Sequence, residues 1–179
     1  MRKVTSVKNI KNPYSKRILS NIINQDPLKI YAKTPSDLQR LTRGLASKHL
    51  HTPLKKGKWS IGQIVSHLCD AEIAMSYRLR MALAQSGNSL QAYDQDKWAD
   101  ALYYDKAKCS EKVKLFSILR AANVSLLKCL SPKEWQRYGM HEERGKETVE
   151  RMVQMLAGHD VNHLKQIENI CRNIVGKNR

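Results

Sequence analysis

Apolar residues recur at helical spacing in four separate stretches of this sequence, and no other feature constrains the fold as strongly. Residues three, four and seven positions apart fall on one face of a helix, so each stretch offers an apolar stripe to a common core. The stretches cover residues 38–45, 61–83, 113–130 and 149–174. Aromatic residues make up only 6% of the chain, with a single Phe, so the core must be mainly aliphatic. This composition favours helices over strands, and we predict an all-α fold.

Capping signals predict where the first two helices begin. Thr34-Pro35-Ser36-Asp37 combines an N-cap residue, a proline at the first helical position and an acid in the first turn, so we expect a short helix to start there. Ser60 and Gln63 match a capping box, in which each side chain satisfies a backbone N–H of the other residue. The helix that follows is predicted to end near Gly87.

Similar signals delimit the second half of the chain. A third helix is predicted over residues 110–130, and the stretch 131–134, SPKE, is a second capping box that opens a short helix containing Trp135. The last helix is expected to begin after Thr148 and to run to about Val175, with Gly176 as its C-terminal stop.

The remaining segments connect these helices. Residues 88–108 lack clear periodicity and are interpreted as one long connection, while residues 138–147 are polar and turn-forming. No stretch alternates convincingly as a strand does. We therefore expect an all-α four-helix bundle with a long crossover connection. Residues 1–25 are interpreted as a basic, only partly ordered lead-in, and residues 26–179 as a single helical bundle domain.

Positive charge is concentrated in the N-terminal third. The chain has 32 basic and 16 acidic residues, and residues 1–58 alone carry 14 Lys/Arg against two Asp. The basic surface is either simply solvated or attracts nucleic acid or another polyanion. Nucleic acid is the less favoured partner, because no basic run is interleaved with aromatics.

Signals for membrane insertion or secretion are missing from the sequence. No apolar run is long enough to span a membrane, the N-terminus lacks a secretory apolar stretch, and the four Cys show no disulfide or structural zinc spacing. These features predict a cytoplasmic protein without a membrane partner.

Two histidines interrupt the apolar stripe of the last helix. His159 and His163 are four residues apart and occupy the gap between Leu156 and Ile167, so both imidazoles should point into the bundle. A buried imidazole needs a partner. The pair alone is a weak signal, because histidines at this spacing are often ordinary core or surface residues.

A third histidine could complete a metal site with this pair. His67 shares a helix face with Ala71 and Ala74, whose small side chains leave space beside its imidazole. Three protein nitrogens around a divalent ion leave one coordination position open, as in catalytic rather than structural metal sites.

The sequence around these histidines resembles the DinB/YfiT-like superfamily of metalloenzymes. The resemblance rests on GKWSIGQIVSHLCDAE at 57–72 and GHDVNHLKQI at 158–167. It is supported by AYDQDKWA at 92–99, FSILRAAN at 116–123 and HEERGKETV at 141–149, which occur in the same order as in the family.

This resemblance, which covers about residues 26–175, implies a four-helix bundle and a divalent metal held by His67, His159 and His163. We expect zinc or nickel at this site. The resemblance also implies that a low-molecular-weight thiol could serve as cosubstrate and that the protein could form a homodimer.

Five further residues are candidates for supporting the metal or binding the substrate. Arg78 could meet an anionic substrate or pair with an acid on a neighbouring helix, and Arg120 is a weaker candidate for the same role. Asp70 could bond a ligand imidazole or lie exposed, and Gln166 could bond a ligand or satisfy a polar spot in the core. His141 could lie at the surface or at the mouth of the site. No residue is assigned as catalytic.

Two functions from different classes follow. The first is a metal-dependent enzyme, either a thiol S-transferase or a hydrolase, that acts on a small molecule. The alternative is a non-enzymatic basic helical protein that binds nucleic acid or another polyanion. The residues leave open whether the protein catalyses a reaction at all.

Overall fold

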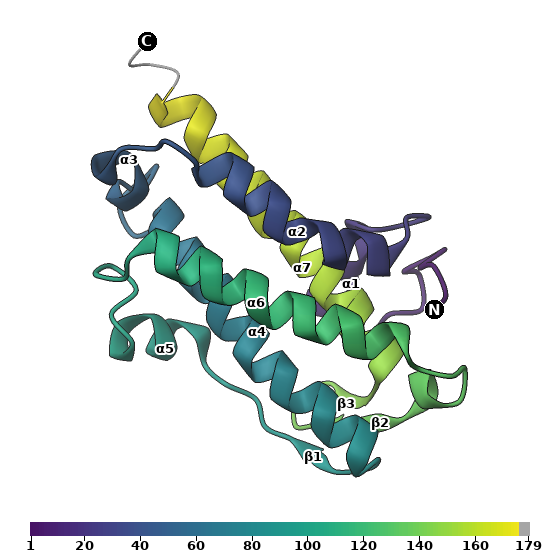
Figure 1. Cartoon of the computed structure of the whole chain (residues 1–179). Helices are drawn as coiled ribbons and strands as arrows, with labels where there is room; N and C mark the ends of the chain where they lie inside the picture. Colours follow the sequence, from purple (N-terminus) through teal and green to yellow (C-terminus); the bar gives the residue numbers. More distant parts are fainter. Residues whose placement is uncertain (176–179) are drawn as a thin grey trace.

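Four long helices form the body of the protein. The computed structural model describes residues 1–175 (Figure 1). The four helices of the bundle are α2 (Pro27–Thr42), α4 (Ile61–Ala84), α6 (Cys109–Lys128) and α7 (Val149–Ile170). The predicted bundle is therefore confirmed. None of the helices in the described part of the chain is long and apolar enough to cross a lipid bilayer.

Helices α2 and α7 lie side by side and run in the same direction. Thr34 near the middle of α2 contacts Asp160, and Arg40, further along α2, contacts Glu168, further along α7. In Figure 1 the two helices overlap along most of their lengths.

Helices α4 and α6 form a second parallel pair. Asp70 contacts Lys112, and ten residues further along α4 Arg80 contacts Asn123. Two parallel neighbours cannot be joined by a tight turn, because the chain must return along the length of the first helix before the second begins. Residues 85–108 make this return, and the long connection predicted at 88–108 lies within them.

Two helices begin at the predicted N-cap residues, Ser60 and Thr148. Ser60 accepts a hydrogen bond from the backbone N–H of Gln63, whose side chain accepts from the backbone N–H of Ser60, so the predicted capping box is confirmed. Thr148 caps α7 by accepting from the N–H of Arg151. A π-helix over Cys171–Val175 follows α7, and the predicted stop at Gly176 lies outside the described residues.

The predicted start of α2 is wrong. The helix begins at Pro27, after Asp26, whose carboxylate accepts from two backbone N–H groups of the first turn, and Pro35 lies inside it. A proline in a helix interior leaves the carbonyl four residues earlier without its N–H donor, which is why Pro35 suggested a boundary. The structure supplies another donor: the guanidinium of Arg120 lies 2.7 Å from the carbonyl oxygen of Tyr31.

The N-terminal segment, interpreted from the sequence as a lead-in, includes a helix. It contains α1 (Pro13–Ser20), which packs against α7 and buries Ile18 and Leu19. Gly158 makes this contact possible, because a Cβ at this position would clash with the carbonyl oxygen of Ile18. The basic residues between the apolar ones concealed this short amphipathic helix.

The segments interpreted as connection and turn contain short strands. Strands β1 (Ser89–Leu90), β2 (Tyr138–His141) and β3 (Gly145–Thr148) form a small sheet in which β1 and β2 are parallel and β2 and β3 antiparallel. The prediction of no strand is therefore wrong, since strands of two to four residues are too short to show alternation. The other short elements are α3 (Ser47–His51), α5 (Gln95–Ala101) and a 3-10 turn (Glu134–Gln136).

A polar layer divides the core of the bundle. Along α7, Val149, Met152, Val153 and Leu156 belong to one apolar cluster, and Ile167 and Ile170 belong to another. Between these clusters the buried α7 residues include His159, Asp160 and His163. Because burial of polar groups without partners is costly, this layer is where function is expected.

Candidate metal centre

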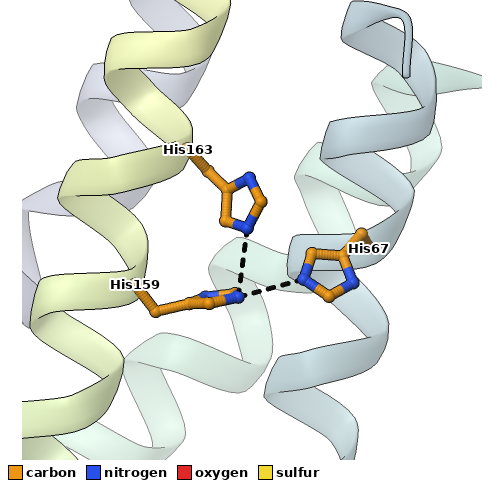
Figure 2. A group of neighbouring side chains, drawn as sticks. All are labelled: His67, His159 and His163. Carbon is orange, nitrogen blue, oxygen red and sulfur yellow. Dashed lines mark hydrogen bonds between the residues drawn. The ribbon is translucent and has the colours of Figure 1, made fainter. Parts of the chain in front are cut away.

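Three imidazoles from two helices converge within the polar layer. The Nε2 atom of His159 lies 3.0 Å from that of His67 and 3.1 Å from that of His163. Figure 2 shows the His67 ring entering from α4 while the other two rings project from α7. All three residues are at most 9% exposed, and their ligand atoms lie within 4.8 Å of one another.

Hydrogen bonds alone do not account for this convergence. The Nε2 atom of a neutral imidazole has either one N–H or one in-plane lone pair, so His159 cannot satisfy two neighbouring Nε2 atoms at once. A tetrahedral zinc ion about 2.0–2.1 Å from each nitrogen would separate them by roughly 3.3 Å, close to the 3.0 and 3.1 Å that separate His159 Nε2 from the other two Nε2 atoms. The three nitrogens therefore fit a divalent cation.

The electrostatic environment keeps these imidazoles neutral, as metal ligands must be. Burial and, to a smaller extent, the charge of the nearby His163 lower the pKa of His67 to about 3. Burial likewise lowers the pKa of His163 to about 4 and that of His159 well below its ordinary value. Lone pairs on the three rings are therefore available to a cation at neutral pH.

The opposite ring nitrogens differ in their partners. The Nδ1 atom of His163 lies 2.9 Å from the side-chain oxygen of Gln166, so Nδ1 carries the proton and Nε2 presents its lone pair to the site. Gln166 thus lies where the sequence suggested. The Nδ1 atoms of His67 and His159 are buried, and neither has a hydrogen-bond partner among the described residues.

Arg120 lies in a buried ion-pair cluster. Its guanidinium contacts Glu72 at 2.9 Å and Asp160 at 2.6 Å, and all three side chains are at most 2% exposed. It also stacks on the ring of Tyr31, 3.6 Å from the ring centroid, while bonding the carbonyl that Pro35 leaves without a donor. These contacts occupy Arg120, so the structure places it among buried carboxylates rather than toward a substrate.

Asp70 is also engaged away from the imidazoles. One of its carboxylate oxygens accepts from the Nζ atom of Lys112 at 3.1 Å, and its side chain is buried, contrary to the exposed alternative. The other oxygen has no hydrogen-bond partner in the described chain. The imidazole of His67 does not receive the carboxylate that the sequence spacing suggested.

Two cavities open beside the histidines. One, of about 490 Å³, is lined by His159, His163 and Gln166 together with Trp59, whose ring packs 4.9 Å from that of His67. The cationic side chains of residues 17, 55 and 58 also line it.

The second cavity, of about 320 Å³, is lined by His67 and His159. Arg78 and His141 also line it, so the structure brings these two predicted residues to the histidines. His141 is buried and not at the surface, and burial lowers its pKa.

Comparison with known proteins agrees with this architecture. The model of the DinB superfamily matches residues 30–167. The chain belongs to the DinB superfamily. A relative from Oceanobacillus iheyensis, named "Putative metal-dependent hydrolase OB0782", is 27% identical over 154 residues, which span 86% of this chain and 89% of the relative. A Bacillus subtilis relative, "Putative metal-dependent hydrolase YfiT", is 23% identical over 147 residues, or 81% of this chain and 82% of the relative.

Solved structures share the DinB-like fold. YfiT from Bacillus subtilis, described as a four-helix bundle of unusual topology, superposes with a TM-score of 0.78 at 21% identity, over 83% of this chain and 86% of that one. The mycothiol-dependent maleylpyruvate isomerase superposes with a TM-score of 0.62 at 12% identity, over 83% of this chain and 62% of that one. At sequence identities of 21% and 12%, these superpositions establish a shared fold and nothing about activity.

Several residues of the site were missed by reasoning from sequence. Tyr14 on α1 lines both cavities, and Arg144 lines the smaller one. Trp59, one residue before the capping box of α4, was not among the predicted site residues, although its ring packs against that of His67. No periodic signal could have revealed Tyr14, because it comes from the segment interpreted as lead-in.

Proposed function

We propose that this protein is a metal-dependent enzyme that acts on a small molecule, as a hydrolase or as a thiol S-transferase. The observation that carries the proposal is the convergence of three buried imidazole nitrogens beside two cavities. Ligands from the protein on one side and space for a substrate on the other are typical of catalytic metal sites.

His67, His159 and His163 would hold the ion through their Nε2 atoms. A bound zinc or nickel ion would supply Lewis acidity, which polarises an electrophile and lowers the pKa of a water or thiol ligand. Around it, Gln166 fixes the tautomer of one ligand ring, and Trp59 covers the His67 ring. The three neutral ligands leave the ion's full charge available to polarise a substrate.

Whether the enzyme is a hydrolase or a thiol transferase depends on whether water or a thiol enters the larger cavity as the nucleophile. Hydrolysis is supported by the names of the relatives, and thiol transfer by the fold shared with a mycothiol-dependent enzyme. The larger cavity is lined by Arg17, Lys55 and Lys58 and by the single acid Asp96, so it would attract an anionic thiol. Turnover of an electrophile only in the presence of an added low-molecular-weight thiol identifies a transferase, and turnover in its absence a hydrolase.

The metal can be tested without knowing the substrate. Protein purified without a His-tag should contain one divalent ion per chain by mass spectrometry, and His163→Ala should lose it while remaining helical by circular dichroism. His51→Ala, which removes an exposed histidine on α3, is the matched control and should keep its metal. Equal metal content in His163→Ala and the unaltered protein would refute the proposal.

The proposed setting of the enzyme is the cytoplasm. The four cysteines are free thiols, which suits a reducing compartment. Homodimerisation stays a prediction.

A further inference from the structure

Arg78 is a buried cation that borders the smaller cavity. Its side chain lies on α4, three turns after His67, and is 8% exposed. One guanidinium nitrogen donates to the backbone carbonyl oxygen of Gln91, and the guanidinium carbon lies 5.5 Å from the centroid of the Tyr93 ring. Both contacts are with uncharged groups.

No carboxylate pairs with Arg78 among the described residues. The other arginine lining the cavity, Arg144, is paired: its Nε and Nη2 atoms each lie 2.9 Å from a carboxylate oxygen of Glu147. Glu143 also lines the cavity but is exposed. Burying a guanidinium without a counter-charge is costly, so a fold that keeps one beside a cavity is expected to supply its partner from outside.

The cavity between Arg78 and the histidines has an apolar wall. Ala71, Met75, Met155 and Leu156 line it, and the small Ala71 side chain leaves room next to His67. A volume of about 320 Å³ suits a molecule of modest size. The cavity therefore has a cationic group at Arg78, imidazoles at His67 and His159, and an apolar wall.

We propose that Arg78 binds the carboxylate of a small organic acid whose apolar body lies along this wall, with its other end toward the three histidines. The inference rests on the proposed function, for which it names the substrate class. A carboxylate is favoured over a phosphate because one uncompensated positive charge matches a monoanion, whereas a phosphate monoester carries about −1.5 to −2 at neutral pH. Arg78 is thus a binding and specificity residue.

Calorimetric titration with acetate, butanoate and benzoate tests this assignment on protein both with and without metal. Benzamide is the neutral counterpart of benzoate, and phenyl phosphate is the dianionic one. At least one carboxylate should bind, and Arg78→Gln should weaken it by about tenfold or more, as expected for loss of a charge-assisted hydrogen bond. Benzamide and phenyl phosphate should bind more weakly than benzoate.

Arg80→Gln is the matched control, because it removes the same charge from an exposed side chain two residues away. It should bind the carboxylate as the unaltered protein does. Ala71→Leu is a second variant that fills the cavity without touching the charge, and it should also abolish binding. If Arg78→Gln fails to fold, this variant carries the test.

Several results would overturn the inference. These are no binding of any of the three carboxylates, equal affinity in the unaltered protein and Arg78→Gln, binding that requires the metal but not Arg78, or tighter binding of phenyl phosphate than of benzoate. The two proposals fail separately. A protein that binds a carboxylate through Arg78 but holds no metal contradicts the proposed function, and one that holds metal but binds no carboxylate contradicts this inference.

Discussion

Acidifying the metal-free protein should destabilise it strongly, because three buried imidazoles must stay neutral in the folded state. His67, His159 and His163 all have pKa values lowered from 6.5, to about 3 for the first and about 4 for the last. In the unfolded chain each regains its ordinary pKa and binds a proton below about pH 6.5. The unfolded state then binds more protons, so stability present above pH 6.5 is lost as the pH falls toward the folded-state pKa values.

The size of this loss in unfolding free energy follows from the difference between the ordinary histidine pKa and the pH of the measurement. At about pH 5.5, one unit below 6.5, protonation stabilises the unfolded state by about 1.4 kcal/mol per imidazole. Three imidazoles together give about 4 kcal/mol. This is a large part of the roughly 5–15 kcal/mol by which a domain of this kind is stable.

Urea denaturation followed by circular dichroism, in the presence of a chelator, measures this loss. The free energy of unfolding of the metal-free protein should fall by about 4 kcal/mol between about pH 7.5 and about pH 5.5. His163→Gln carries one imidazole fewer, so its loss over the same interval should be smaller by about 1.4 kcal/mol. A loss under about 1 kcal/mol, or the same loss in both proteins, would show that the imidazoles are not held neutral.

Three further changes test the packing that positions the site. Arg120→Met should cost about 3–5 kcal/mol of unfolding free energy in urea denaturation, because two buried carboxylates lose their counter-charge; an unchanged midpoint would contradict the ion-pair account. Gly158→Ala should cost about 1–3 kcal/mol and increase hydrogen exchange of α1, since its methyl group would clash with the carbonyl oxygen of Ile18; unchanged protection of that helix would argue against its docking on α7. Ser60→Ala should lower stability by about 1 kcal/mol through loss of the cap of α4, and a cost near zero by thermal denaturation would mean that the capping box contributes nothing.

The sequence was most informative where one local rule governs the structure. Residues four apart on a helix share a face, so the direction of His159 and His163 followed from their spacing and from the apolar residues around them. Capping boxes act through neighbouring residues only, which is why the start of α4 at Ser60 was predicted correctly. The bundle itself follows from the apolar periodicity.

The features that the sequence did not predict depend on contacts between segments far apart in the chain. Pro35 is a valid local signal for a helix start, but Arg120, 85 positions later, replaces the hydrogen bond that the proline removes. The same contact explains why Arg120 is buried. Likewise, nothing local shows that Arg78 lacks a counter-ion or that residues 13–20 form a helix packed against Gly158.

X-ray absorption spectroscopy of the zinc-loaded protein tests the central claim most directly, because it reports the ligands of the ion itself. The geometry of His67, His159 and His163 predicts three imidazole nitrogens at about 2.0–2.1 Å and a fourth light atom from outside the chain. His163→Ala should leave fewer imidazoles or no bound zinc. A spectrum with fewer than three imidazoles in the unaltered protein, or with sulfur ligands, would contradict the proposed metal centre.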